Sequence, residues 1–257
     1  MVKKICILIF CIYTIVILNL MLTVRLVDSS ANIVIPTEKQ YSIPILVYHR
    51  IGYTTDDLTV SPEKFEQDLI ELKKNNYTTI TISTFEDLLN GYEVNLPPKP
   101  ILITFDDGYD DNYLNAFPIL QRNQMTATFF IITNLINTPN RMTTEEIKIM
   151  QLNGMFFGSH TANHLQLANL DKETIWSELV YSKKKLEDTL NISIYSLAYP
   201  TGNFDDKVIK VANDMGYEFG FTIKLGICTN NSNKMELPRI PIFRFNKSVI
   251  LEINKNL

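Results

Sequence analysis

The chain has 257 residues, of which 46% are hydrophobic and 20% are charged, and its formal net charge is −4. This length allows one large domain or two small ones, and the hydrophobic content supports a sizeable core, which excludes global disorder. The negative charge and the lack of a basic patch interleaved with aromatic residues argue against nucleic acid as a partner. Outside the N-terminal apolar segment the only cysteine is Cys228, so neither an intradomain disulfide nor a Cys-x-x-Cys metal site is expected.

The N-terminal segment predicts export. Residues 5–23 are almost continuously apolar and are long enough to cross a bilayer as a helix. Lys3 and Lys4 precede this helix and favour an N-terminus on the inside, and no Ala-x-Ala cleavage site follows it. We therefore expect a transmembrane anchor or signal segment over residues 1–27, a linker over 28–43, and an extracytoplasmic domain over 44–257, membrane-anchored or secreted.

Hydrophobic periodicity and capping residues predict alternating strands and helices from residue 45 onward. Strands are expected over residues 45–49, 78–82, 101–105, 126–133, 155–158, 196–199 and 219–223. Helices are expected over residues 62–72, 84–90, 112–122, 144–153, 172–190 and 205–215, several of them closed by a glycine. Repeated strand-then-helix units imply an α/β fold with a mostly parallel sheet, either open or closed as a barrel.

Polar residues follow several of these strands at their carboxyl ends. In chain order they are His49, Asp106, Asp107, His160, Tyr199 and Pro200. In barrel enzymes the carboxyl ends of the strands carry the chemistry, so the pattern favours a barrel over an open sheet.

The strand over residues 101–105 is apolar and β-branched, yet it ends in Asp106 and Asp107. An unpaired carboxylate is costly away from water, and a metal ion is the simplest group that would compensate this charge. His160 and His164 are four residues apart, and on a helical turn both imidazoles would share one face. Two histidines and one carboxylate, with a position open for water, form a standard catalytic zinc site.

Only one of the two aspartates is expected to bind the metal, because neighbouring side chains in an extended chain point to opposite sides. The other would remain free as a base, a division of roles that suits hydrolysis. Taken singly, Asp-Asp-Gly is usually a turn, His-x-x-x-His is often an ordinary pair, and a lone histidine is more often structural. The three histidines of the chain and the two carboxylates all fall at one predicted rim, and this combination favours a site.

Two motifs resemble those of the polysaccharide deacetylases, the NodB-homology or carbohydrate esterase family 4 group. Residues 104–109 read Thr-Phe-Asp-Asp-Gly-Tyr, and residues 159–164 read Ser-His-Thr-Ala-Asn-His. The resemblance implies a distorted (β/α) barrel of the NodB-homology type and metal-dependent removal of acetyl groups from a polysaccharide. It assigns Asp107, His160 and His164 as metal ligands and Asp106 as general base. It also implies that the backbone N–H of Tyr109 stabilises the oxyanion.

The chain departs from the family pattern in two places. The third motif, residues 197–202, lacks the usual arginine, and no histidine follows His164 to supply a late general acid. Both differences resemble exported deacetylases of poly-β-1,6-N-acetylglucosamine, in which a Tyr-His-Arg segment supplies the histidine. Residues 48–50 match that segment, so His49 is expected to protonate the leaving amine. Tyr199, Pro200 and Arg239 are assigned to the substrate side, and Arg239 is the arginine expected to orient Asp106.

The expected reaction is therefore removal of N-acetyl groups from an extracellular N-acetylglucosamine polymer, poly-β-1,6-N-acetylglucosamine first, with peptidoglycan strands or chitin-like oligomers as alternatives. An inactive, metal-retaining glycan-binding protein is the alternative from another class, although Asp106 and His49 argue against it because binding needs neither base nor acid. Adjacent carboxylates cannot flank a sugar bond as in a retaining glycosidase, and no Gly-x-Ser-x-Gly motif indicates a serine hydrolase. One divalent ion is expected, Zn²⁺ first, with Co²⁺, Ni²⁺ or Fe²⁺ as alternatives.

Overall fold

Parallel strands in the order β10-β9-β8-β7-β6-β2-β12 form the main sheet of the structure, a computed structural model that describes residues 40–257. A further short strand, β5, also pairs with β6. The strands are β2 (Ile45–Tyr48), β5 (Thr78–Thr79), β6 (Pro100–Phe105), β7 (Thr128–Ile131), β8 (Phe156–Ser159), β9 (Ser196–Ala198), β10 (Phe219–Phe221) and β12 (Ile240–Pro241). The predicted α/β class with a parallel sheet is confirmed.

The sheet is curled, and its closure into a barrel is incomplete. Between the edge strands β10 and β12, the described part of the chain contains only an isolated bridge from Phe221 to Leu237. Leu237 lies on the segment that leads into β12, and its backbone N–H donates to Gly220 O (2.8 Å). Ile242 directly follows β12, and its backbone N–H donates to Val47 O (2.9 Å). One short segment therefore contacts both edges, and the predicted barrel is a distorted one without a continuous ladder at this seam.

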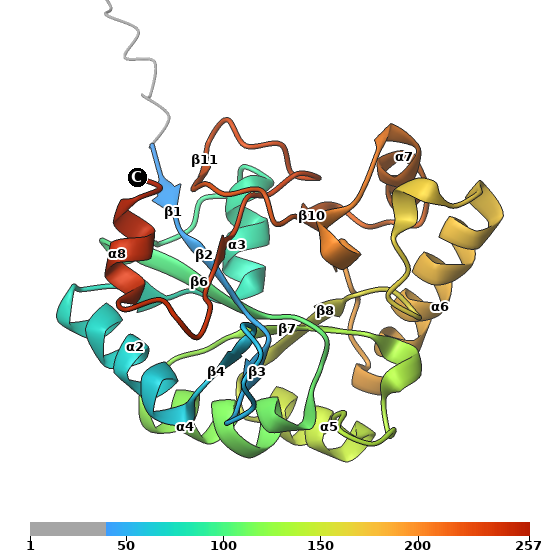
Figure 1. The fold of residues 1–257 in the computed structure, drawn as a ribbon. Helices are drawn as coiled ribbons and strands as arrows, with labels where there is room; N and C mark the ends of the chain where they lie inside the picture. Colours follow the sequence, from blue (N-terminus) through green and yellow to red (C-terminus); the bar gives the residue numbers. More distant parts are fainter. Residues whose placement is uncertain (1–39) are drawn as a thin grey trace, which may run out of the picture. The chain divides into compact units, whose positions relative to one another are not determined.

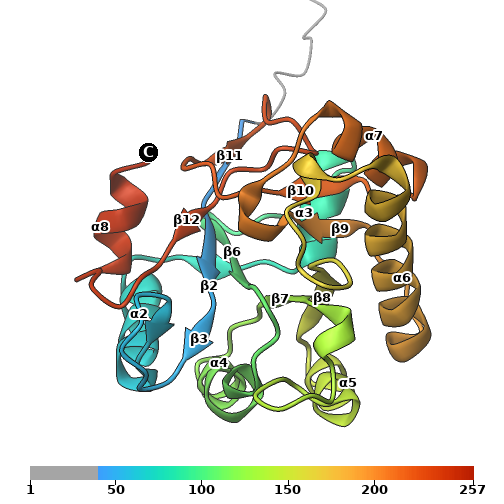
Figure 2. The same ribbon diagram turned by 45° about the vertical axis from the view of Figure 1, so that its right-hand side comes forward.

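Helices surround the outer face of the curled sheet, as Figures 1 and 2 show for α2, α4, α5 and α6. They are α2 (Pro62–Lys74), α3 (Ile82–Leu89), α4 (Phe117–Arg122), α5 (Thr144–Leu152), α6 (Lys172–Leu190), α7 (Asp206–Asp214) and α8 (Val249–Asn254). A π-helical turn, η1 (Asn112–Ala116), precedes α4, and short 3-10 turns are η2 (Thr133–Leu135), η3 (Leu167–Asn169) and η4 (Pro200–Gly202). Two small pairs complete the fold: β1 (Ser42–Ile43) with β11 (Cys228–Thr229), and β3 (Arg50–Ile51) with β4 (Thr59–Val60).

Two hydrophobic clusters follow the alternation of side chains along the strands. On β6, Ile101, Ile103 and Phe105 belong to the larger cluster, which also contains residues of the outer helices. Leu102 belongs to the smaller cluster, which contains Phe130, Phe221 and, from α3, Phe85. The smaller cluster fills the interior of the curled sheet. The same alternation along each strand decides which side chains point inward at the carboxyl end of that strand.

Local signals placed most helices correctly. The helix predicted over residues 172–190 is α6, and the capping box of Thr143 and Glu146 is present at the start of α5. The strand predicted over residues 78–82 is wrong beyond Thr79, because the hydroxyl of Thr81 accepts from Thr84 N and caps α3, which begins at Ile82.

The compact unit of the described chain is Gln40–Leu257. It includes β1, which lies in the last residues of the predicted linker and pairs with β11. None of the helices in this unit combines the length and apolar character that a membrane span requires. The predicted anchor over residues 1–27 lies outside the described residues.

Candidate active site

The strand β6 places the first carboxylate inside the curled sheet. Leu102, Thr104 and Asp106 alternate with the outward residues of β6, and the backbone N–H of Asp106 continues the pairing by donating to Tyr48 O (3.0 Å). The carboxylate of Asp106 is 2% exposed. A buried carboxylate at this position requires a compensating group, as the sequence indicated.

That group is the guanidinium of Arg239, which is fully buried. Its Nη1 and Nη2 donate to the two oxygens of Asp106 at 2.8 and 2.7 Å, a bidentate pair. Thr104 Oγ1 accepts a further bond from its Nη1 at 3.2 Å, and Thr222 O accepts from its Nε at 2.8 Å. Burial alone would raise the pKa of Asp106, but the positive charges of Arg239 and His160 lower it by more. The pKa therefore lies below its ordinary value, and the carboxylate is ionised at neutral pH.

The second carboxylate leaves the strand through a left-handed turn. Asp107 has φ 77° and Gly108 has φ 71°, so both residues lie in the region that favours glycine. A Cβ at Gly108 would lie 3.0 Å from Ile131 Cδ1, so the turn also needs the missing side chain. Arg141 Nη1 donates to Asp107 O (2.8 Å) and holds the turn. This turn directs the two aspartate side chains apart. The sequence analysis expected them to separate because they alternate along an extended chain, and that reason is wrong, because the chain is not extended at Asp107.

The two imidazoles lie on a loop after β8, and the prediction of a helical turn is wrong. Thr161 and His164 have φ values of 66° and 61°, which no α-helix contains. The hydroxyl of Thr161 accepts from His164 N (3.0 Å), and Thr161 N donates to Ser159 Oγ (3.1 Å). Side-chain hydrogen bonds of this kind stabilise an irregular loop in place of a helix.

Asp107, His160 and His164 form a compact cluster of potential ligand atoms, all within 4.8 Å of one another. Asp107 Oδ1 lies 3.4 Å from His160 Nε2 and 3.5 Å from His164 Nε2. Ligands at 2.0–2.1 Å from a tetrahedral ion are separated by about 3.4 Å, so these two separations fit one divalent cation.

Hydrogen bonding fixes which nitrogen of His160 faces this cluster. Its Nδ1 lies 2.8 Å from Ala198 O, and because a carbonyl only accepts, Nδ1 carries the proton. The lone pair is therefore on Nε2, on the side of Asp107, as a metal ligand requires. Burial lowers the pKa of His160, but Asp106 and Asp107 raise it above its ordinary value, so the site attracts positive charge.

His49 joins the same rim from β2. Burial lowers the pKa of His49 below its ordinary value, and the charges of Asp106 and Asp107 act in the opposite direction. The backbone carbonyl of His49 accepts from Asn112 Nδ2 at 2.8 Å. His49 directly follows Tyr48, whose carbonyl accepts from Asp106 N (3.0 Å), so His49 and Asp106 lie at the same ends of two paired parallel strands.

The ring of Tyr109 is held between two guanidinium groups. The Cζ atoms of Arg50 and Arg141 lie 4.5 and 3.9 Å from its centroid. Arg50 also pairs with Asp111 through Nε at 2.8 Å. These contacts hold the ring of Tyr109, two residues beyond Asp107.

Tyr199 and Pro200 do not line the surface of the site, contrary to the prediction that they contact substrate. The side chain of Tyr199 is fully buried, stacks on Phe204, and donates from its hydroxyl to Met235 O (3.1 Å). Pro200 is also buried. The residue just before Tyr199 does contact the site, because Ala198 O accepts from His160 Nδ1 (2.8 Å). Arg239 is likewise buried beneath Asp106, which leaves it no surface for substrate.

Two arginine contacts escaped the sequence reasoning. Arg141 lies on an irregular segment before α5 and carries no motif, so nothing in the sequence indicates its contacts with Asp107 and Tyr109. Asp111 could have been found, because it continues the acidic run after Tyr109 and Arg50 is the arginine of the Tyr-His-Arg segment.

The fold and the site are those of a class of protein: a hydrolase with a site for one divalent cation beside a second, buried carboxylate. The polysaccharide deacetylase family profile matches residues 93–220. This chain is 34% identical over 215 residues to YxkH of Bacillus subtilis (strain 168), which is named as a polysaccharide deacetylase. The match covers 84% of this chain and 76% of the YxkH chain. The poly-β-1,6-N-acetyl-D-glucosamine N-deacetylase of Staphylococcus aureus (strain N315) is 30% identical over 198 residues, 72% of this chain and 68% of its own.

Among solved structures, the deacetylase PplD of Streptococcus pyogenes in complex with acetate superposes with a TM-score of 0.79 at 30% identity. The match covers 85% of this chain and 99% of that one. The chain belongs to the polysaccharide deacetylase family, carbohydrate esterase family 4, and the protein is a polysaccharide deacetylase.

Proposed function

We propose that the protein removes N-acetyl groups from an extracytoplasmic N-acetylglucosamine polymer, poly-β-1,6-N-acetylglucosamine in particular. The observation that carries this proposal is the position of His49, which directly follows β2 at the end of the sheet where the neighbouring strand β6 ends in Asp106 and Asp107. An imidazole supplied there substitutes for the late histidine that the chain lacks. The Staphylococcus aureus relative named for this polymer supports the substrate.

In the proposed reaction, Asp107, His160 and His164 hold the metal, Zn²⁺ first and Co²⁺, Ni²⁺ or Fe²⁺ as alternatives. When bound, a divalent ion polarises the acetyl carbonyl and acidifies water. Asp106 accepts the proton of the attacking water, and Arg239 keeps that carboxylate ionised and fixed in orientation.

Two further groups complete the proposed chemistry. The backbone N–H of Tyr109 donates to the oxygen that becomes negative as water adds to the carbonyl. His49 then donates a proton to the nitrogen as the carbon–nitrogen bond breaks, so that acetate and a free amine leave. Burial lowers the pKa of His49, which makes its imidazolium a stronger acid toward that amine.

The proposed location is outside the cytoplasm, with the apolar segment over residues 5–23 as a membrane anchor or signal. The N-terminal lysines before this segment support an orientation with the domain outside.

The test offers β-1,6-linked and β-1,4-linked N-acetylglucosamine oligomers to the purified full chain and measures free amines. We expect amines from the β-1,6-linked oligomers at a higher kcat/KM, and their loss in Asp106→Asn. Faster reaction on the β-1,4-linked oligomers would overturn the proposed linkage, and equal rates for the parent and Asp106→Asn would overturn the proposed base.

A further inference from the structure

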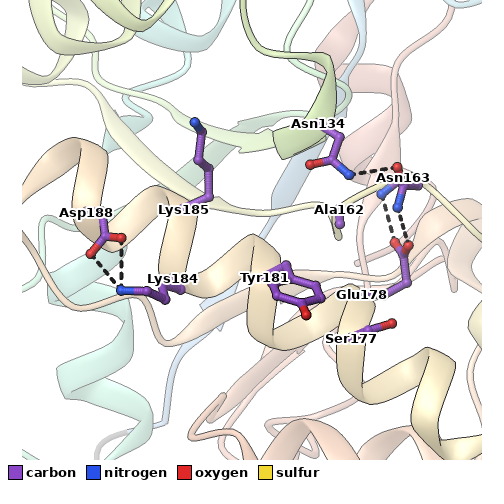
Figure 3. A pocket seen from close by; sticks show the side chains of 9 residues that line it. All are labelled: Asn134, Ala162, Asn163, Ser177, Glu178, Tyr181, Lys184, Lys185 and Asp188. Carbon is purple, nitrogen blue, oxygen red and sulfur yellow. Dashed lines mark hydrogen bonds and ion pairs between the residues drawn. The ribbon is translucent and has the colours of Figure 1, made fainter.

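A buried carboxylate outside the cluster faces the loop that carries both imidazoles. Glu178, in the first half of α6, is 3% exposed. Its Oε2 accepts from the backbone N–H of Asn163 at 2.8 Å, and its Oε1 accepts from Nδ2 of the same residue at 2.6 Å. Figure 3 shows both contacts, with Glu178 directed from α6 toward Asn163. Asn163 lies between the two histidines of the cluster and directly precedes His164.

Glu178 forms no ion pair within the described part of the chain. Across residues 40–257, the ion pairs of α6 join Lys183 to Glu187 and Lys184 to Asp188, and none includes Glu178. A buried carboxylate needs hydrogen-bond donors in place of water, and the two N–H groups of Asn163 supply them. The carboxylate and the loop therefore depend on each other.

The loop needs such support because its backbone is strained. Thr161 and His164, one on each side of Asn163 along the chain, adopt left-handed φ values, which persist only where the surroundings fix them. From the η2 side, Asn134 N donates to Ala162 O (3.0 Å), and Asn134 Nδ2 donates to Asn163 Oδ1 (2.8 Å). From the α6 side, the described contact with Asn163 is the carboxylate of Glu178.

We propose that Glu178 is a positioning residue for the metal site. Through Asn163 it fixes the loop so that the Nε2 atoms of His160 and His164 face Asp107. The inference rests on the divalent-metal site of the proposed function. Loss of a partner that orients a metal ligand lowers metal affinity by about 10–100-fold, and this is the effect expected here.

The hydrogen-bond pattern permits a reciprocal exchange as a test. In Glu178→Gln, the new amide donor meets the Nδ2 donor of Asn163. In Asn163→Asp, two carboxylates face each other. In the double variant Glu178→Gln/Asn163→Asp, the glutamine oxygen accepts from the backbone N–H of residue 163 and its amide donates to the new carboxylate, so the pairing is restored. The second oxygen of that carboxylate still accepts from Asn134.

A matched control lies on the same helix. Lys184 pairs with Asp188 on the exposed side of α6, and both residues line the surface hollow of about 570 Å³ that also borders Asn163 and Glu178 (Figure 3). Lys184→Gln therefore changes the same helix and the same hollow without touching the loop.

The experiment titrates the metal-free full chain and its variants with Co²⁺ and measures the dissociation constant and the d–d absorption spectrum. Thermal melting of each metal-free protein reports folding separately. We expect binding about 10–100-fold weaker in each single variant, an altered spectrum, and recovery in the double variant to within about threefold of the parent. Lys184→Gln should bind as the parent does.

Three results would overturn the inference: single variants that bind as tightly as the parent, a double variant that stays as weak as the singles, or a control that weakens equally. If Asn163→Asp does not fold, Glu178→Gln alone decides, because it keeps the volume of the side chain. A parent chain that binds no Co²⁺ would instead overturn the proposed metal site, so the two failures are distinguishable.

Discussion

Replacement of Arg239 by methionine tests the strongest buried interaction of the site. Methionine retains an apolar, unbranched side chain but removes the guanidinium that makes two hydrogen bonds to Asp106 and one each to Thr104 and Thr222. Asp106, 2% exposed, is then left as an uncompensated buried charge. Breaking such a pair costs about 3–5 kcal/mol, which lowers Tm by roughly 6–20 °C for a domain of this size.

The assay is chemical and thermal unfolding of the full chain, and the chain offers a matched control. Arg122 also forms a bidentate pair, with Glu66 at 2.6 and 2.8 Å, but its side chain is 50% exposed. Solvent screens that pair, so Arg122→Met should leave Tm almost unchanged.

The double variant Asp106→Asn/Arg239→Met separates charge from packing. It removes both charges, so it should recover much of the stability lost in Arg239→Met while remaining inactive. The reasoning is refuted if Arg239→Met is no less stable than Arg122→Met, or if the double variant is less stable than Arg239→Met.

Three further predictions concern other parts of the fold. Burial raises the pKa of Glu86 to about 7, and Ser196 Oγ donates to it at 2.6 Å. The protonated form is favoured in the folded state, so this group's contribution to stability is fully present below the unfolded pKa near 4.5 and is lost as the pH rises through 7. Glu86→Gln should therefore gain up to about 3 kcal/mol over the parent at pH 8 and nothing at pH 4, measured by denaturation at both pH values. His49→Gln should lower kcat by about 10²–10⁴-fold with the metal content unchanged, and an unaltered kcat would exclude it as the proton donor. A Cβ at Gly220 would lie 2.4 Å from the hydroxyl oxygen of Tyr199, so Gly220→Ala should lower Tm by several degrees, whereas Gly52→Ala, whose new Cβ would meet nothing nearer than 3.8 Å, should cost less.

The sequence predicted the parts of the fold that depend on local chemistry. The capping box of Thr143 and Glu146 and the extent of α6 were confirmed because neighbouring residues decide them. The prediction of a strand over residues 78–82 was wrong where two local signals conflict. Thr81 belongs to a β-branched run but also caps the N-terminus of α3, and in the structure it acts as the cap.

The candidate site was predictable as a set of residues but not as a geometry. Asp107, His160 and His164 converge because parallel strands place their carboxyl ends at one edge, which the order of elements implies. The left-handed turn at Thr161 has no sequence signal, because a β-branched residue rarely adopts positive φ. The Asp-Asp-Gly motif indicates the turn at Asp107, since Asp and Gly tolerate positive φ, but it does not show where the carboxylate points.

The remaining interactions of the site join residues that are far apart along the chain. The expectation that Arg239 orients Asp106 is confirmed, although the two residues lie 133 positions apart along the chain and only the arrangement of the strands brings them together. The pairing of Glu178 with Asn163 was missed because each residue alone is typical of an exposed helix or a polar loop. In both cases burial creates the interaction, and a single sequence reports burial only through its periodicity.

The central claim is that hydrolysis depends on a cation held by Asp107, His160 and His164. The most direct measurement is the rate of acetate release from a β-1,6-linked N-acetylglucosamine oligomer by the full chain, first with a chelator and then with Zn²⁺ restored. The account predicts that release stops with the chelator, returns with Zn²⁺, and does not return in His160→Gln. Release that continues unchanged in the chelated protein would contradict it.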